Sequence, residues 1–196
     1  MITIIHGNIL ETSVDAIVNP AHVSLLAGSG LCGVIHKSTA GIELEEHCES
    51  LGGQSYGDVV ITPAFELTQF RHIIHACSPR WWDGNRGEVD TLKLTYENIR
   101  DVVTNARVSS VAIPALATGS YRFPVEVAAE IALNVMRDVE FDVLFVNMEQ
   151  SKHECYLNTY ASISRTKSHR SQLQTHQYTI ECATSQACLT DTYTPL

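Results

Sequence analysis

Two glycine-rich segments of this chain carry residue types that bind phosphate groups. Residues 25–33 have the sequence LLAGSGLCG, and residues 113–124 have the sequence IPALATGSYRFP. Each segment follows an apolar, β-rich run and precedes a helical pattern. Glycines let a ligand approach the main chain, and the start of the following helix directs free N–H groups and a positive dipole end at an anion. Two such turns on one sheet predict a diphosphate bound between them.

The elements that must position these turns alternate along the chain. Apolar β-rich runs predict strands at 2–5, 16–18, 58–63, 72–77, 111–114 and 143–146, and helical spacing predicts helices at 34–49, 88–106, 125–138 and 153–164. This alternation predicts an α/β fold, a three-layer α/β/α sandwich with a mixed, largely parallel central sheet. In such folds the ligand site lies at the carboxyl ends of the strands, where both glycine-rich turns fall.

The length of 196 residues and the apolar content of 44% predict one domain followed by a tail. We place the domain at residues 1–165. Residues 166–196 are rich in Ser, Thr and Gln without a sustained period, and they form a polar appendage. Disorder of this appendage is favoured over pairing of residues 178–182 as an extra edge strand.

The charge balance limits the partners of the chain. The net charge is −9, and residues 1–150 hold nine Lys and Arg against nineteen Asp and Glu. Such an acidic body argues against nucleic acid as a partner, because nucleic acid is held by a basic face. A single diphosphate remains compatible, since main-chain amides bind anions without contributing net charge.

Composition also predicts the compartment and the absence of cofactors. The chain contains no apolar run of the roughly 20 residues that a membrane span requires, and its start lacks the pattern of a signal peptide, so we expect a cytoplasmic protein without a membrane partner. The six cysteines form no CxxC pair and are expected to be reduced. Because His72, His75 and Cys77 alternate along a strand, no metal site and no cofactor are predicted.

Several spaced motifs together resemble the macrodomain family. They are 7–9 (GNI), 14–22 (VDAIVNPAH), 28–36 (GSGLCGVIH), 74–76 (IHA) and 113–124, in the family's order over roughly residues 1–160. The resemblance implies a three-layer α/β/α fold that binds ADP-ribose. Some members of the family hydrolyse ADP-ribosyl bonds or the acetyl ester of O-acetyl-ADP-ribose.

By this resemblance, the two turns hold the diphosphate from opposite sides. One side is formed by Gly28, Ser29, Gly30, Leu31 and Gly33, and the other by Ala117, Thr118, Gly119, Ser120 and Tyr121. The hydroxyls of Thr118 and Ser120 are expected to add donors. Arg122 stands where the family commonly has glycine, and two roles stay open for it, pairing with a phosphate or solvation at the loop rim.

The resemblance places the adenine between Asn8, Ile9 and Met148. Asn8 replaces the aspartate that accepts a hydrogen bond from the adenine amino group in most relatives, and its neutral amide is a weaker acceptor. Alternatively, Asn8 only caps the loop after the first strand. Met148 stands near the position of a stacking aromatic and offers polarisable contact in its place.

The distal ribose is expected beside Asn19, His22 and Cys32. Asn19 matches the first asparagine of the family's Asn-x-x-Asn motif, whereas His22 replaces the second. His22 could hold the ribose or act as a base toward a water, or it is a loop histidine without a role. Cys32 replaces the aspartate credited with activating water in the hydrolytic branch, and a neutral thiol cannot act as that base.

These departures favour a binding module over an enzyme. The sequence predicts a reader of ADP-ribose or ADP-ribosylated protein with absent or weak turnover. The alternative is a hydrolase that removes ADP-ribose from protein or deacetylates O-acetyl-ADP-ribose, with His22 and Cys32 as the candidate catalytic residues. A weaker third hypothesis is an α/β domain for a different nucleotide, such as a phosphorylated ribose.

Overall fold

Six strands form one sheet in the computed structural model, which describes residues 1–39 and 42–165. The strands follow the order β1-β6-β5-β2-β4-β3 across the sheet. Their bounds are β1 Ile2–His6, β2 Ala16–Pro20, β3 Val59–Pro63, β4 His72–Ala76, β5 Ser110–Pro114 and β6 Asp142–Asn147. Residues Met1–Thr159 form one compact unit that contains the whole sheet.

Five of the six strands run in the same direction. β1 pairs with β6, β6 with β5, β5 with β2 and β2 with β4 in parallel, while the edge strand β3 pairs antiparallel with β4. The parallel pairing brings the carboxyl ends of β1, β2, β4, β5 and β6 to one edge of the sheet. This edge therefore collects every loop in which the sequence predicts a site residue.

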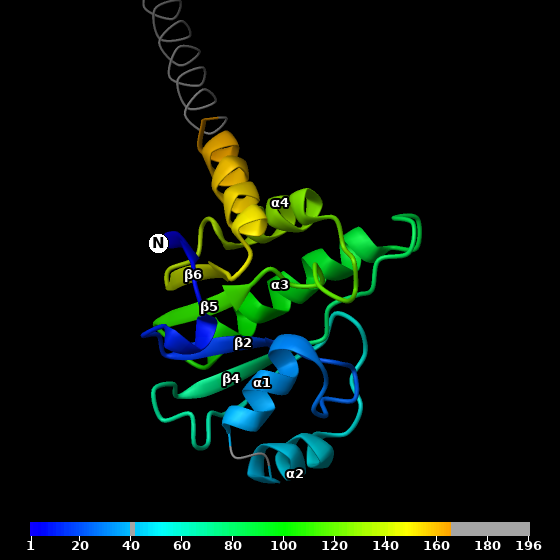
Figure 1. Cartoon of the computed structure of the whole chain (residues 1–196), viewed down its shortest axis with the longest axis vertical. Coiled ribbons are helices and arrows are strands. Elements are labelled where there is room, and N and C mark those ends of the chain that lie inside the picture. The colour runs from blue at the N-terminus through cyan, green and yellow to red at the C-terminus, as the bar shows by residue number, and fades with distance from the viewer. Residues whose placement is uncertain (40–41, 166–196) are drawn as a thin grey trace, which may run out of the picture. The chain divides into compact units, whose positions relative to one another are not determined.

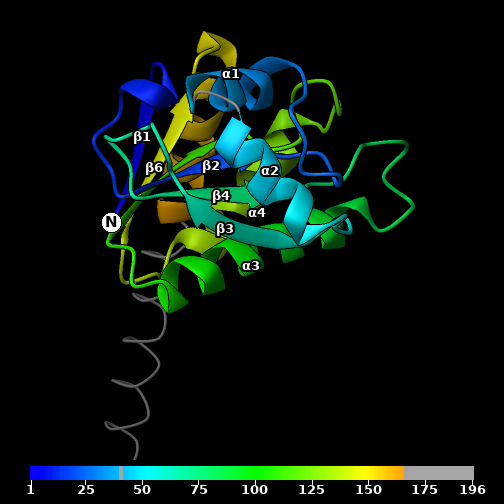
Figure 2. The same ribbon diagram turned by 90° about the horizontal axis from the view of Figure 1, so that it is seen from below.

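Helices cover both faces of the sheet. The helices are α1 Gly30–Ser38, α2 Ile42–Leu51, α3 Glu88–Asn105 and α4 Val125–Met136. α1 and α2 lie on one face and α3 lies on the other (Figure 2), where α4 packs against α3. A last helix covers residues 150–165 of the described chain, and within the compact unit its Tyr156 packs on Phe145 of β6 with ring centroids 5.3 Å apart.

The apolar core beneath α1 and α2 arises from alternation along the strands. Ile17 of β2, Ile73 of β4, Ala112 of β5 and Val146 of β6 point to this face and meet Ile35 of α1. Neighbouring strand residues point to the opposite face and are equally buried, because a parallel sheet covered on both faces carries apolar residues at successive positions. The predicted α/β/α sandwich with a mixed, largely parallel sheet is confirmed.

Two local predictions were wrong. The single helix expected at 34–49 is two helices: α1 ends where the Thr39 N–H donates to the Ile35 carbonyl and the Thr39 hydroxyl donates to the His36 carbonyl. The hydroxyl bond satisfies the His36 carbonyl, which in a longer helix would accept from the next main-chain N–H. A short 3-10 helix, η1 Ile9–Glu11, also follows β1 where no helix was predicted.

The appendage predicted at 166–196 lies outside the described residues, including the segment 178–182. Within the described part, no helix is both long and apolar enough to cross a membrane.

Candidate functional site

The predicted site residues gather at the carboxyl edge of the sheet. Asn8 follows β1, Asn19 lies near the end of β2, the second glycine-rich loop follows β5, and Met148 follows β6. The neighbouring strands β6, β5, β2 and β4 are labelled in Figure 1. The first glycine-rich loop connects β2 to α1 at the same edge. The parallel topology thus brings together segments that are more than 100 residues apart in the sequence.

The first loop is held by a close main-chain contact within itself. Gly33, in the first turn of α1, sits where an added Cβ would overlap the carbonyl oxygen of Gly28. Gly30 begins the helix with φ +60°, a conformation that glycine adopts without strain. The Ser29 side chain makes no capping hydrogen bond. The first-turn N–H groups of α1 and the Ser29 hydroxyl are therefore candidate donors for an anion.

The second loop turns through two residues with positive φ. Ala117 has φ +62° and Arg122 has φ +57°. The turn is closed by the Arg122 N–H, which donates to the Gly119 carbonyl over 2.9 Å, and by the Phe123 N–H, which donates to the Ala117 carbonyl over 3.0 Å. In the described hydrogen-bond pattern the N–H of Gly119 donates to no main-chain carbonyl, so it remains a donor for a ligand.

One hydroxyl of the second loop has an internal role. The Thr118 hydroxyl donates to the Ala115 carbonyl over 2.9 Å. Its proton stabilises the loop, which leaves only the oxygen lone pair for a ligand. Ser120 and Arg122 are exposed at the loop surface, and the structure is compatible with either role that the sequence left open for Arg122.

Asn19 is anchored by a buried polar chain that runs across three strands. Its Nδ2 lies 3.1 Å from Nδ1 of His75, the residue opposite it on β4. Nε2 of His75 lies 3.1 Å from the hydroxyl oxygen of Thr62 on β3, and that hydroxyl donates to the Pro63 carbonyl over 3.0 Å. All three side chains of this chain are buried.

These contacts assign the tautomer of His75. Because the Thr62 proton is given to a carbonyl, the Thr62 oxygen accepts from Nε2–H of His75, and Nδ1 of His75 accepts from the Asn19 amide. Burial first, and then the neighbouring His36 and His47, lower the pKa of His75 to about 3, so the ring is neutral at physiological pH. Among the described residues, the Oδ1 atom of Asn19 is buried without a partner.

His36 of α1 stands beside this chain. Its ring centroid is 6.3 Å from that of His75, and both of its ring nitrogens are buried without a partner among the described residues. Burial lowers the pKa of His36, with Glu45 partly opposing the effect, which favours the neutral ring. The apolar core below α1 therefore contains, next to Asn19, a small group of polar side chains that carry no charge.

His22 is exposed at the start of the loop after β2. Its Nδ1 accepts from the Ser24 main-chain N–H over 3.2 Å and lies 2.9 Å from the Ser24 hydroxyl oxygen. A ring nitrogen that accepts an N–H bond carries no proton, so the neutral ring bears its proton on Nε2. In this arrangement His22 presents a donor to solvent.

Cys32 lies within the first turn of α1 and is buried. Its thiol donates to the Leu26 carbonyl over 3.9 Å. Cys48 and Cys77 lie close enough to interact electrostatically with it. Burial chiefly raises the pKa of Cys77 to about 12 and that of Cys48 to about 11, so both remain thiols. Cys32, Cys48, Cys77 and Cys155 are all free.

The end of the site assigned to adenine has a mixed character. The side-chain Oδ1 of Asn8 accepts from the Leu10 N–H over 3.1 Å, and the Asn8 Nδ2 donates to the Glu11 carboxylate over 3.1 Å. Asn8 therefore caps η1, as the alternative interpretation proposed. The oxygen keeps a second lone pair for a ligand donor. Ile9 is buried in the core beneath, and the Met148 side chain is 69% exposed and available for an apolar contact.

Two residues that support the site had no predicted role in it. They are His75, which holds the Asn19 amide, and Thr62, which contacts His75. A usable signal was present, since a histidine at a predicted buried position needs a polar partner. Within the described residues, no group of three His, Cys, Asp or Glu side chains is arranged to hold a metal.

A separate hollow of about 750 Å³ lies at the opposite edge of the sheet. Its lining includes residues just before β5 and β6, among them Arg107, Ser109 and Phe141, and residues of α3 and α4. It shares no residue with the glycine-rich loops, and it does not enlarge the candidate site.

A sheet of this topology, with two glycine-rich loops at its carboxyl edge, defines an α/β domain with a candidate phosphate site. Residues 18–132 match the family model described as Macro domain. A macro domain-containing protein of Mesorhizobium japonicum is 36% identical over an alignment of 165 residues, which covers 81% of this chain and 93% of that protein. The chain belongs to the macrodomain family.

Other relatives carry functional descriptions. A protein of Pantoea vagans named O-acetyl-ADP-ribose deacetylase 1 is 41% identical over an alignment of 140 residues. The alignment covers 69% of this chain and 81% of that protein. The macrodomain of Oceanobacillus iheyensis, solved with ADP, superposes with a TM-score of 0.78 at 29% identity, covering 84% of this chain and 92% of that one. The Trypanosoma brucei macrodomain, solved with ADP-ribose, shares the fold with a TM-score of 0.71 at 24% identity, covering 79% of this chain and 67% of that one.

Proposed function

We propose that this chain binds ADP-ribose, free or attached to protein, and acts as a reader with absent or weak turnover. The observation that carries the proposal is the pair of glycine-rich loops at one edge of the sheet, each with main-chain N–H groups free to donate. These donors form an anion site without a net charge, which suits a diphosphate on an acidic protein. Relatives solved with ADP and ADP-ribose support the same ligand.

In this proposal the buried amide of Asn19 contacts the distal ribose. Its Nδ2 is committed to His75, so the unpartnered Oδ1 is the atom that meets the ligand, as an acceptor for a ribose hydroxyl. An unsatisfied buried carbonyl oxygen costs about 1–3 kcal/mol, and a ligand hydroxyl recovers part of this free energy. His22 adds a donor through Nε2–H.

Three observations support weak turnover. The segments 16–42 and 114–125 contain no Asp or Glu, so neither loop supplies a carboxylate base. The Nδ1 lone pair of His22 is occupied by the Ser24 N–H, and its other nitrogen bears the proton, so the ring cannot accept a proton from water in this arrangement. The buried Cys32 thiol donates a hydrogen bond to the Leu26 carbonyl.

The second candidate function is hydrolysis of ADP-ribosyl bonds or of O-acetyl-ADP-ribose. The 41% identical relative named O-acetyl-ADP-ribose deacetylase 1 favours it. Such a reaction needs an activated water near the distal ribose. Because His22 and Cys32 act as hydrogen-bond donors in this arrangement, the proton of this water would pass to a phosphate of the substrate or to a rotated His22 ring.

Two experiments separate these functions. Competition calorimetry with ADP-ribose, ADP and ribose phosphates tests the binding proposal, which requires ADP-ribose to bind most tightly and to shift the NMR amide signals of Gly30 and Gly119. Incubation with an auto-modified ADP-ribosyltransferase and with O-acetyl-ADP-ribose tests turnover. Product above background would support the hydrolase, and activity that survives both His22→Ala and Cys32→Ala would exclude both as the base.

A further inference from the structure

The loop between β4 and α3 presents two neighbouring tryptophans in different environments. Trp81 is partly buried, with its ring 4.7 Å from that of Phe123. Its main-chain N–H donates to the Tyr121 carbonyl over 2.9 Å, which ties the loop to the second glycine-rich loop. Trp82 is 60% exposed. A large aromatic side chain is thus displayed beside the candidate site on a segment anchored to that site.

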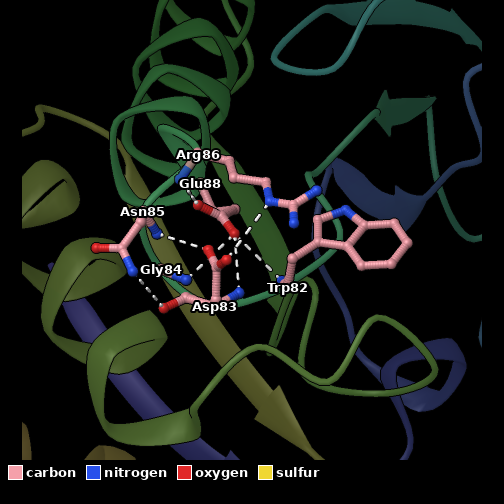
Figure 3. A network of polar contacts seen from close by, with 6 residues as sticks. All are labelled: Trp82, Asp83, Gly84, Asn85, Arg86 and Glu88. Atoms are coloured by element: carbon pink, nitrogen blue, oxygen red, sulfur yellow. Dashed lines mark hydrogen bonds and ion pairs between the residues drawn. The ribbon is translucent and has the colours of Figure 1, made fainter.

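A buried carboxylate fixes the shape of this loop. Oε1 of Glu88 accepts from the main-chain N–H groups of Trp82, Asp83 and Gly84 over 3.2 to 3.3 Å, and Oε2 accepts from the Arg86 N–H over 2.7 Å (Figure 3). Burial by itself would raise the pKa of Glu88, but these bonds and that of its own N–H outweigh burial and lower the pKa to about 2. The loop is therefore ordered before any partner binds.

Two guanidinium groups flank the exposed ring. The Cζ atoms of Arg80 and Arg86 lie 5.1 Å and 5.5 Å from the centroid of the Trp82 ring. Cation–π contacts of this kind engage the faces of the guanidinium groups, so their N–H edges can pair with carboxylates. We refer to these three side chains as the Arg–Trp–Arg surface.

The acidic groups of the loop do not neutralise this surface fully. The carboxylate of Glu88 is committed to main-chain N–H groups, and Asp83 forms an ion pair with Arg86 over 3.5 Å. Arg80 extends the positive field toward the site, since its guanidinium opposes the rise that burial and Tyr56 cause in the pKa of Tyr121. A cationic, aromatic surface on a chain of net charge −9 is a local exception.

We propose that the Arg–Trp–Arg surface binds an acidic segment of the protein that carries the ADP-ribose group. This inference rests on the proposed function, because the modified residue would sit in the site while its flanking residues cross the loop. Carboxylates of the segment pair with the guanidinium groups of Arg80 and Arg86, and an apolar part packs on Trp82. Preorganisation by Glu88 lowers the entropy lost on binding.

The observations favour a polypeptide over a polynucleotide on this surface. A polyanion requires several phosphate contacts on a basic face, whereas residues 1–150 are strongly acidic. A short segment with two or three carboxylates needs only the cations already present.

Calorimetry with a matched set of ligands tests this inference on the full chain. The ligands are free ADP-ribose, an ADP-ribosyl peptide with flanking Glu residues in a non-hydrolysable linkage, the same peptide with flanking Ser residues, and the unmodified acidic peptide. We expect the acidic ADP-ribosyl peptide to bind about tenfold more tightly than the Ser version, which equals about 1.4 kcal/mol. Trp82→Ala and Arg80→Gln should each remove most of this preference.

Free ADP-ribose should bind Trp82→Ala within about twofold of the parent, since the uncharged Trp82 side chain does not belong to the glycine-rich loops. Arg107→Gln removes an exposed arginine at the opposite edge of the sheet and should leave the preference intact. Equal affinity for the acidic and Ser peptides, or a preference that survives both loop variants, overturns the inference.

The remaining outcomes separate this inference from the proposed function. If ADP-ribose fails to bind the parent chain, the proposed function fails, and a Trp82 indole signal that shifts with the unmodified acidic peptide still supports the surface. Displacement of the acidic peptide by a single-stranded oligonucleotide at lower concentration than by free acidic peptide would assign the surface to nucleic acid and overturn the inference.

Discussion

Nδ2 of Asn19 lies 3.1 Å from Nδ1 of His75, and this contact fixes which end of the Asn19 amide can meet a ligand. The orientation of His75 depends in turn on the Thr62 hydroxyl, which accepts from Nε2–H. A side chain on the edge strand β3 therefore controls the polarity of a group at the carboxyl end of β2, two strands away.

Thr62→Val should disturb the site through this chain. The substitution removes the acceptor of the His75 Nε2–H bond, so we expect the free energy of unfolding to fall by about 1–3 kcal/mol. The ring should also lose its preference for the Nε2–H tautomer, which ¹⁵N NMR of the imidazole nitrogens reports directly. If Nδ1 becomes protonated, Asn19 must turn its amide, and ADP-ribose affinity should fall about fivefold or more.

Thr95→Val is the matched control for that experiment. Thr95 is buried in α3, and its hydroxyl donates to the Thr91 carbonyl rather than to a site residue. The Thr95→Val protein should lose stability without a change in its affinity for ADP-ribose. A Thr62→Val protein with unchanged tautomer and unchanged affinity would show that the polar chain does not orient Asn19.

Acid should destabilise the protein below pH 6.5 because of His75. The unfolded chain protonates this histidine near pH 6.5, whereas burial lowers its folded pKa to about 3. Between these values the unfolded state binds more protons, so its free energy falls relative to the folded state as the pH falls. Chemical denaturation should show full stability above pH 6.5 and a progressive loss down to pH 3.

His75→Gln tests the origin of this slope, since glutamine does not titrate. Its unfolding free energy should depend less on pH between 6.5 and 3, although the residual effect of His36 remains. An unchanged slope would assign the acid sensitivity to other groups. The loop carboxylate of Glu88 contributes in a lower window, from about pH 4.5 to about 2.

Gly33→Ala should damage the first loop, because the new Cβ would overlap the Gly28 carbonyl oxygen, a main-chain atom that cannot move independently. We expect a loss of about 1–3 kcal/mol in unfolding free energy and weaker ADP-ribose binding. Gly119→Ala is the contrast, since its Cβ would meet nothing within 4 Å. Its thermal midpoint should stay within a degree or two of the parent in calorimetry, and equal losses in both variants would contradict this account.

The fold could be predicted from the sequence because its signals were strong and local. Apolar runs located all six strands, and the glycine-rich turns marked the carboxyl edge of the sheet. The interruption between α1 and α2 was missed, because the helical periodicity continues through residues where Thr39 closes the helix with its own hydroxyl. The antiparallel direction of β3 was not predicted either, since strand direction depends on pairing and not on composition.

The candidate site was predicted less completely for a similar reason. The loops and Asn19 carry recognisable spacing. The residues that hold Asn19 in place lie further along the chain: His75 on β4, which contacts Asn19, is 56 positions away, and Thr62 on β3, which contacts His75, is 43 positions away. Tautomers and hydrogen-bond directions, which decide whether His22 can act as a base, exist only once the side chains have met. Glu88 likewise had no predicted role beyond the start of the helix at 88–106, although it organises a whole loop.

Arg122 allows the two roles that its sequence position left open to be separated. Its φ of +57° is unfavourable for an L-residue, so Arg122→Gly should raise the free energy of unfolding by roughly 1 kcal/mol. Arg122→Gln removes the charge but retains the strain, and its stability should match the parent. If the guanidinium pairs with the diphosphate, both variants should bind ADP-ribose several-fold more weakly and with a smaller dependence on salt. If Arg122 is only solvated at the rim, calorimetry should give parental affinity for both.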